Sequence, residues 1–389
     1  MLWGMSLTVD ILEGMDRVEA AEWDALTGEH DPFVEHAFLH TLEAAGCVGA
    51  EAGWIPCHVV VRDQGALVGA MPLYLKDNSF GEYIFDWAWA EAAEAGGLRY
   101  YPKLVSAVPF TPVAGRRLLV RPGANESEVR DAMLAGAMNL ADAVGARSLH
   151  ILFCSQAELP ACQLAGLMPR LSYQFHWTNH GWSDFDAYLA ALRSQPRKKI
   201  RRERRRAAAA GLELATRSGE ALEAQTWEAL HGFYIETASR KWGRPYLNAE
   251  FFRLAHRTLS HRAVVTLACR GDALVAGALS FCKGQQLYGR YWGCTEDAHS
   301  LHFELCYHRP IELCLDRGWR RFEAGAQGLH KLKRGLLPAA THSAHWIRHH
   351  ELSRSVEQFL ERERRAVTYE MEQLLSHGPF RRDRALAVG

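Results

Sequence analysis

The 389-residue sequence lacks several features that would point directly to a partner or a compartment. Its 45 basic and 45 acidic residues leave no formal net charge, so no overall field attracts DNA or a membrane surface. No apolar run approaches the roughly 18 residues that a membrane span needs. The N-terminal residues contain no basic segment followed by an apolar one, so no signal peptide is expected. We therefore predict a cytoplasmic protein without a membrane span and without DNA as a partner.

Cysteine pairs and common catalytic motifs are missing as well. The nine cysteines form no CxxC pair, and those in apolar runs, such as Cys154 and Cys269, are expected to be reduced and buried. The absence of GxxxxGK[ST], of GxGxxG after a strand, of HExxH and of GxSxG argues against nucleotide hydrolysis, dinucleotide redox chemistry, zinc proteolysis and serine hydrolysis. His342, His345 and His349 have a ligand-like spacing, but no carboxylate or cysteine completes the set, so we predict no metal site.

What the sequence does contain is an internal repeat. Residues 62–73 (RDQGALVGAMPL) and 270–281 (RGDALVAGALSF) each predict a β-hairpin, and GARSLHILF from Gly145 is echoed by GWRRFEAGA from Gly318. Matches in the same order indicate a duplicated domain, although such hairpins also recur in unrelated α/β proteins. We predict an α/β fold with mixed (α+β) sheets flanked by helices, divided into residues 1–180 and 181–389.

A basic segment follows the predicted join of the two domains. Residues 193–206 contain nine basic side chains and one acid, and 193–210 is predicted to be a helix that ends at Gly211. A solvated helix face is one interpretation. The other is an anionic partner, because like charges along a helix repel one another. Phosphate groups of an acyl donor would fit. The residues predicted to bind these phosphates are Arg197, Lys198, Arg201, Arg202 and Arg205.

Chemically active side chains are most concentrated in residues 288–338, which predict a strand, a helix, a second strand and a polar loop. Ligands of open α/β sheets bind at the carboxyl ends of strands. Glu323 is a candidate general base, with an ion pair to Arg290 or Arg320 as the alternative. His330 and Lys331 would contact a carbonyl oxygen or an acidic group of the substrate. The predicted catalytic residues are Glu323, His330, Lys331 and Glu304.

Aromatic and charged residues between 80 and 103 predict a pocket in the first half for an acyl chain or a cationic substrate. A packed core is the alternative for the tryptophans. The predicted substrate-binding residues of both halves are Asp86, Trp87, Tyr101, Lys103, Trp292, His302 and Gln327.

With these segments the chain resembles the FemAB-like family of predicted N-acyltransferases, also described as peptidoglycan biosynthesis or recognition proteins. The resemblance rests on GEYIFDWAWA, RKKIRRERR, LHFELCYHRPIE and FEAGAQGLHKLKRGLLPAATHSAHW, among segments that span nearly the whole chain. It implies two tandem GNAT domains and transfer of an acyl or aminoacyl group to an amine. The usual GNAT pyrophosphate loop is not intact, since EDAHSLHFE and RPGANESE stand in its place.

The leading hypothesis is an N-acyltransferase that acts on a primary amine of a peptide, an amino acid or a cell-wall precursor. No covalently bound cofactor is expected, and acyl-CoA or an acyl-carrier protein is expected as co-substrate. One alternative keeps the fold but takes the acyl group from a charged tRNA. A second alternative is a non-catalytic GNAT pair that binds a peptide or a cell-wall fragment.

Overall fold

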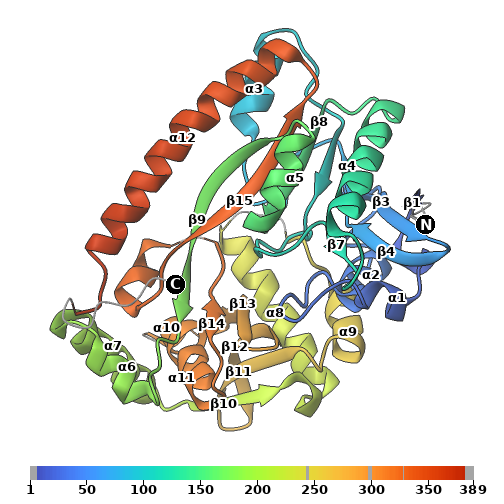
Figure 1. Ribbon diagram of the computed structural model, residues 1–389. Coiled ribbons are helices and arrows are strands. Elements are labelled where there is room, and N and C mark those ends of the chain that lie inside the picture. The colour runs from blue at the N-terminus through green and yellow to red at the C-terminus, as the bar shows by residue number, and fades with distance from the viewer. Residues whose placement is uncertain (1–6, 242–244, 297–299, 327, 382–389) are drawn as a thin grey trace. The chain divides into compact units, whose positions relative to one another are not determined.

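The computed structural model describes residues 7–241, 245–296, 300–326 and 328–381 (Figure 1). The chain divides into two compact units: unit 1 is Met1–Ser172 with Ala340–Tyr369, and unit 2 is Tyr173–Ala339 with Glu370–Gly389. The sequence-based division at residue 180 differs from these units at residues 340–369, which fold with the N-terminal part. The physical reason is a strand pairing, because β15 (Leu337–Ile347) pairs with β8 (Ser148–Cys154) in unit 1.

Unit 1 contains a four-stranded sheet in the order β1-β3-β4-β7 and a second set of strands in the order β15-β8-β6-β5-β2. Helix α4 packs on β1, β3, β4 and β8 and covers the core that Val59, Leu104 and Ile151 share with Met133. The strands are β1 (Leu7–Leu12), β2 (Ile55–Pro56), β3 (His58–Asp63), β4 (Ala66–Met71), β5 (Tyr74–Lys76), β6 (Lys103–Ser106) and β7 (Leu119–Val120). The helices are α1 (Ala20–Asp24), α2 (His36–Ala44), α3 (Trp87–Ala95), α4 (Glu126–Ala143) and α5 (Leu159–Leu164).

Unit 2 has its strands in the order β10-β11-β12-β13-β14-β9. Helix α8 packs on β12 and β13 and also against α9 (Figure 1). The strands are β9 (Met168–Thr178), β10 (Glu213–Ser218), β11 (Ala263–Arg270), β12 (Ala273–Lys283), β13 (Gln286–Cys294) and β14 (Arg321–Glu323). The helices are α6 (Phe185–Ala191), α7 (Ser194–Ala208), α8 (Ala224–Lys241), α9 (Ala249–Thr258), α10 (Leu301–Phe303), α11 (Arg309–Asp316) and the long α12 (His350–Ser376), which begins in unit 1. A π-turn at Glu304–His308 joins α10 to α11.

Both predicted hairpins are present, as β3–β4 and β11–β12, and each has a β-bulge close to its turn. The helix-to-strand repeat is also present. Gly145 and Gly318 each take a left-handed conformation after a helix, with φ of 66° and 65°, and a strand follows each. These strands pair in parallel with an earlier strand, β8 with β6 and β14 with β13. The two halves therefore repeat one order of elements.

Each unit receives one strand from the other half of the chain. β9 follows β8 and α5 in sequence, yet it pairs with β14 in unit 2 through His176–Thr178. β15 follows β14 in sequence, yet it pairs with β8 in unit 1 through His342–Ile347. This exchange was not expected from the sequence, because strand pairing over such separations leaves no local signal.

The predicted basic helix is confirmed as α7. The nine cysteines are free thiols, with five of them buried and Cys269, Cys282, Cys294 and Cys306 half-buried. Within the described parts of the chain, none of the helices combines the length and the apolar character that crossing a membrane requires.

The packing of α8 on the sheet generates a prediction at Gly293 of β13. A Cβ atom there would lie 2.1 Å from the carbonyl oxygen of Phe233 on α8, and backbone cannot move aside as a flexible side chain does. Gly293→Ala should therefore lower the free energy of unfolding in urea by about 1–3 kcal/mol or more, as overpacking does. Gly232→Ala on α8 is the matched control, since its Cβ meets nothing within 4 Å. That control should be neutral or stabilise by up to about 1 kcal/mol. Equal losses of stability at both positions would contradict the claim that Gly293 is needed for its close approach to the backbone of α8.

Candidate functional site

The candidate site in unit 2 begins where two parallel strands separate. β14 pairs with β13 only from Gln286↔Arg321 to Tyr288↔Glu323, whereas β13 continues to Cys294. The carboxyl ends of parallel strands are the usual place for ligands in α/β folds. Beyond Tyr288, β13 therefore continues without β14 beside it.

Aromatic and imidazole side chains gather around this stretch of β13. The ring of Trp292 lies 4.7 Å from that of His302, measured between centroids, and the ring of His302 lies 6.4 Å from that of His330. Tyr307, in the π-turn, shares a hydrogen bond of 2.9 Å between its Oη and Nε2 of His330. The structure therefore brings together three predicted residues, and it adds Tyr307, which the sequence did not indicate.

Glu323 lies in an internal ion pair. Its side chain is about 1% exposed, its Oε1 is 3.0 Å from Nη2 of Arg321, and its Oε2 is 3.9 Å from Arg290 and from Nε2 of His176. Burial and the nearby arginines hold the pKa of His176 well below its usual value, so this imidazole is neutral. The alternative for Glu323 was an ion pair with Arg290 or Arg320. The structure has Arg290 at 3.9 Å and Arg321 as the nearer partner at 3.0 Å.

Lys331 is buried beside this cluster. It is about 2% exposed, and its Nζ donates a 2.6 Å hydrogen bond to the carbonyl oxygen of Gly325. Burial, and then the charge of Arg290, lower its pKa to about 7. An amine in this state exchanges its proton near neutral pH.

Glu304 anchors a helix. This carboxylate is buried. Its Oε1 accepts a 3.2 Å hydrogen bond from Arg204 and forms an ion pair with Arg309 at 3.4 Å. Arg204 of α7 also binds both carboxylate oxygens of Glu312, each at 2.9 Å. The ion pairs join α7 to the helix that contains the π-turn and leave Glu304 little access to a substrate.

The opposite face of α7 is basic and exposed. Lys198, Arg201, Arg202 and Arg205 follow one another at helical intervals of three and four residues, so they share one face. Ile200, Glu203 and Ala207 are buried on the other face. The fifth predicted residue, Arg197, is half-buried. On this face Arg201 lies 3.8 Å from Asp186, and a pair this long and this exposed to solvent does little to neutralise the face.

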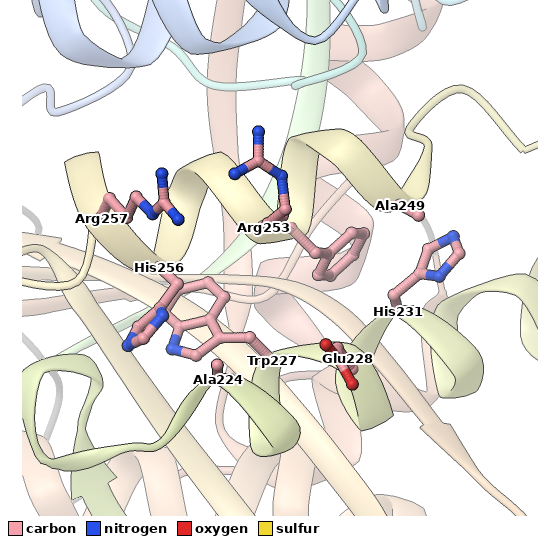
Figure 2. Close-up of a pocket in the computed structure, with 9 residues that line it drawn as sticks. Ala224, Trp227, Glu228, His231, Ala249, Arg253, His256 and Arg257 are labelled. Carbon is pink, nitrogen blue, oxygen red and sulfur yellow. The ribbon is translucent and has the colours of Figure 1, made fainter.

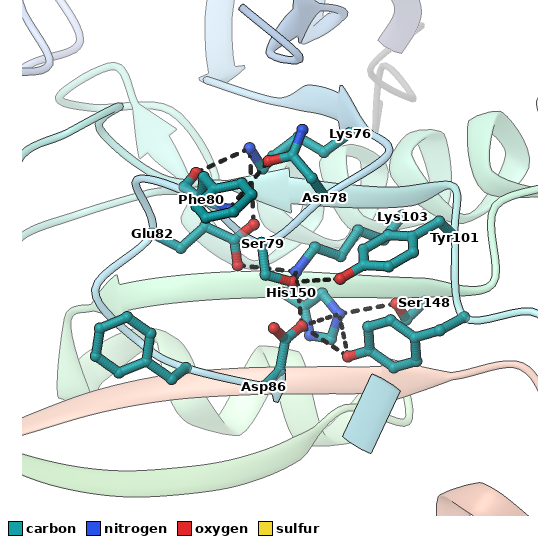
Figure 3. Close-up of polar contacts among 12 residues, drawn as sticks. Lys76, Asn78, Ser79, Phe80, Glu82, Asp86, Tyr101, Lys103, Ser148 and His150 are labelled. Atoms are coloured by element: carbon teal, nitrogen blue, oxygen red, sulfur yellow. Dashed lines mark hydrogen bonds and ion pairs between the residues drawn. The ribbon is translucent and has the colours of Figure 1, made fainter. Parts of the chain in front are cut away.

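In unit 1 the predicted pocket around Asp86 and Lys103 is instead a buried ionic cluster (Figure 3). Lys103 is fully buried and donates to Oδ2 of Asp86 at 2.6 Å, Oε2 of Glu82 at 2.9 Å and Oγ of Ser79 at 2.7 Å. Burial opposes ionisation of Asp86, but the charge of Lys103 outweighs it and holds the pKa of this carboxyl well below its usual value. The structure thus places these two predicted substrate-binding residues in a buried ion pair, in which Lys103 holds one oxygen of each of the carboxylates of Asp86 and Glu82.

More polar groups surround this cluster. Tyr100 donates to Oδ2 of Asp86 at 2.7 Å, and the Nδ1 atoms of His150 and His345 are 2.8 Å apart. Burial, and then the charge of Lys103, lower the pKa of His150 to about 3, so the imidazole is neutral. Of the other residues predicted here, Tyr101 shares a 2.9 Å hydrogen bond with Ser79. Trp87 lies at the start of α3, where its ring packs 5.1 Å from that of the exposed Phe80.

A small pocket of about 110 Å³ lies between α8 and α9 (Figure 2). The buried rings of Trp227 and Phe252 form part of its wall, and the exposed side chains of Glu228, Arg253 and Arg257 stand around it. None of the residues predicted from the sequence lines this pocket. Gln327, which the sequence predicted to bind substrate, lies outside the described residues. Across the described ranges, no group of three or more His, Cys, Asp or Glu side chains is arranged to hold a metal ion.

A model of the FemAB-like family, described as peptidoglycan biosynthesis/recognition, matches residues 14–382. The chain belongs to this family. No curated protein matches it. Among solved structures, FemX has a TM-score of 0.52 with 13% identity, over 87% of this chain and 98% of FemX.

Two other solved structures have a similar fold. One is the C-terminal domain of a putative lysylphosphatidylglycerol synthetase from Agrobacterium fabrum, with a TM-score of 0.53 and 11% identity over 88% of this chain and 94% of that chain. The other is a protein of unknown function from Bacteroides thetaiotaomicron, with a TM-score of 0.52 and 9% identity over 87% of this chain and 99% of that chain. The expected α/β fold of two tandem GNAT-like domains is confirmed.

The buried amine of Lys331 generates a prediction for stability. The folded protein releases this proton near pH 7, whereas the unfolded chain holds it to about pH 10.5. Between these values the unfolded state binds more protons, so Lys331 makes stability rise with pH by up to about 1.4 kcal/mol per pH unit. Lys331→Met should flatten the rise between pH 7 and about pH 9 in urea titrations. The exposed Lys333 provides the control, because Lys333→Met should leave the slope unchanged. If the free energy of unfolding of Lys331→Met rose with pH as steeply as that of the unaltered protein, the pKa of the Lys331 amine would not be lowered by folding.

Proposed function

We propose that this chain is an N-acyltransferase or aminoacyltransferase that moves an acyl group from a thioester or ester to a primary amine. Membership of the FemAB-like family and the fold shared with FemX support this reaction class. The family description supports a peptide or a cell-wall precursor as the source of the amine. The amine nitrogen attacks the carbonyl carbon, a C–N bond forms, and the C–S or C–O bond of the donor breaks.

The observation that carries the proposal is the exposed imidazole of His330 near the part of β13 that extends beyond β14. His330 is solvent-exposed, yet its ring is fixed by a hydrogen bond to the buried Tyr307. An imidazole held in this way can take the proton that the attacking amine loses. Glu323 is the weaker candidate for this step, because Arg321 and Arg290 already neutralise its buried carboxylate.

Charge that develops on the carbonyl oxygen needs hydrogen-bond donors. Backbone N–H groups of β13 beyond Tyr288 are the first source that we propose, since β14 no longer pairs with them. Lys331 is the second source. Its amine donates a hydrogen bond to the carbonyl oxygen of Gly325, just after the end of β14. It would have to exchange this hydrogen bond for one to the substrate.

The donor carries phosphate in each form that we consider: coenzyme A, a carrier protein's prosthetic arm or a charged tRNA. We assign its binding to the exposed basic face of α7, formed by Lys198, Arg201, Arg202 and Arg205. The inner face of α7 is fixed by Arg204 and Glu203, so the outer face is held in place before the donor arrives. A preformed basic surface loses little entropy when phosphate binds.

Transfer activity can be measured with labelled acyl-CoA, acyl-carrier and aminoacyl-tRNA donors and a lysine-containing peptide as acceptor. His330→Gln keeps a polar side chain of similar reach and should lower kcat/KM by about 100- to 10,000-fold, the usual contribution of a general base. The control His261→Gln changes an exposed histidine between α9 and β11 and should keep full activity. Unchanged turnover in His330→Gln would exclude His330 as the base. Binding of the peptide without turnover for any donor would favour the non-catalytic alternative.

The basic face generates a separate prediction about the donor. The triple variant with Arg201, Arg202 and Arg205 changed to Ala should weaken donor binding, and a variant with Arg354, Arg362 and Arg365 of α12 changed to Ala is the control of equal charge. For a tRNA donor, the slope of log Kd against log salt should fall by about two to three units in the first variant. For acyl-CoA, affinity should fall with a much smaller change in slope. Equal effects of the two triple variants would contradict a specific role for α7.

A further inference from the structure

A single buried carboxylate, that of Glu203, joins α7 to the short helical turn Leu329–Arg334, which carries His330 and is called the His330 turn below. Glu203 is about 5% exposed. Its Oε1 accepts a 2.6 Å hydrogen bond from Nη2 of Arg334, and its Oε2 accepts one of 3.1 Å from Nε of the same guanidinium. Because one planar group holds both oxygens, the contact fixes orientation as well as distance.

Arg334 connects this carboxylate to the backbone of His330. Its remaining nitrogen, Nη1, donates a 2.7 Å hydrogen bond to the carbonyl oxygen of His330. Arg334 is about 1% exposed, and the central carbon of its guanidinium lies 3.5 Å from the centroid of the ring of Phe303. All three nitrogens of the guanidinium are therefore hydrogen-bonded, and stacking on the ring further restricts its rotation.

The end of the His330 turn is held by α6 as well. The hydroxyl of Tyr188 donates a 2.6 Å hydrogen bond to the carbonyl oxygen of Arg334. Gly335 follows with a φ of +80°, and a Cβ atom there would collide with that hydroxyl, so the close approach requires glycine. The side chain of His330 is exposed, whereas the backbone that carries it is fixed from two directions.

Glu203 occupies the same turn of α7 as three of the basic side chains assigned to the donor. Arg201, Arg202 and Arg205 lie within two residues of it in sequence and are exposed, while Glu203 lies on the buried face. One helical turn rises only about 5.4 Å, so the two faces are close and cannot move independently. The phosphate-binding face and the His330 turn thus share one short segment of helix.

We propose, resting on the transferase function above, that Glu203 is a positioning residue that makes α7 the common support of the donor's phosphates and of the His330 turn. The amine and the carbonyl must meet at about 3–3.5 Å, with the base in reach of the amine. A fixed link between the helix that binds the donor and the turn that carries the base meets this requirement. Stability alone does not account for the ion pair, because replacing a buried pair by apolar residues is often neutral.

Glu203→Gln keeps the shape of the side chain and removes the charge that Arg334 faces. We expect kcat to fall by about 10- to 100-fold, as misplacement of a catalytic group by about 1 Å can cause. Affinity for inorganic tripolyphosphate, a probe of the basic face, should stay within about twofold, because the outer arginines are unchanged. Glu363→Gln is the matched control. It removes a carboxylate that Arg170 of unit 1 also holds with two hydrogen bonds, each of 2.8 Å, and should leave kcat unchanged.

Hydrogen exchange reports on the turn without any substrate. The amides of Lys331 and Gly335 are hydrogen-bonded within the turn, to the carbonyl oxygens of Gly328 and Leu332. In Glu203→Gln they should exchange about tenfold faster or more, since loss of one partner of a buried pair costs more than that factor. Exchange in β11 and β12 should not change, which distinguishes a local loss of position from a general loss of stability.

A double variant, Glu203→Met with Arg334→Met, replaces the pair by apolar side chains and should fold while kcat stays low. Full turnover in this variant would mean that the pair serves stability only. Unchanged kcat and unchanged exchange in Glu203→Gln would overturn the proposal, and so would a loss of tripolyphosphate affinity as large as the loss of kcat. If no donor supports transfer by the unaltered protein, the proposed function fails, while hydrogen exchange still decides whether Glu203 holds the His330 turn.

Discussion

The three-residue contact between β13 and β14 is the constraint on which the rest of unit 2 depends. Because the pairing ends at Tyr288↔Glu323, β13 continues to Cys294 beside β12 but without β14, and Trp292 lies in this part of the strand. Two glycines make this geometry possible. Gly289 packs against Phe322 of β14, and Gly293 brings β13 against the backbone of α8, so neither could carry a larger side chain without moving its neighbour. Helix α8 is thus packed closely against β12 and β13.

Buried charges hold α7 against the π-turn and against Arg334. A buried ionised group is tolerated only when it is paired and hydrogen-bonded, and losing one partner usually costs about 3–5 kcal/mol. Glu203 meets this condition with Arg334 and His308, and Arg204 meets it with Glu304 and Glu312. In isolation, repulsion between the many basic side chains of α7 would destabilise this helix. The inner ion pairs offset that repulsion, and they leave the outer arginines as the charges that a phosphate-bearing ligand can neutralise.

The sequence predicted the repeated hairpins, the paired Gly145 and Gly318 turns and the basic helix, because each has a local pattern. The spacing of Arg321 and Glu323 is a further local pattern. These residues are two apart on one strand, so both side chains lie on the same face, which predicts their ion pair. The exchange of β9 and β15 and the contact of Asp86 with Lys103 depend on pairings between distant segments, and composition does not reveal them. The π-turn that carries Tyr307 has no sequence signature at all.

The repeat also bears on why we propose unit 2 for the chemistry. Counting from Gly145 and Gly318, His150 and Glu323 occupy the same position, and each pairs with a histidine on the exchanged strand, His345 or His176. Both units therefore place polar groups in the centre of a sheet, which is stable only if these groups are satisfied. In unit 1 Lys103 and Asp86 are paired with each other and almost completely buried, which leaves them little access to a substrate. Unit 2 has the equivalent buried pair of Glu323 and His176. The loop after β14 adds the exposed imidazole of His330, which is hydrogen-bonded to Tyr307. The transfer that we propose needs a base that is both fixed and accessible, and His330 meets both conditions.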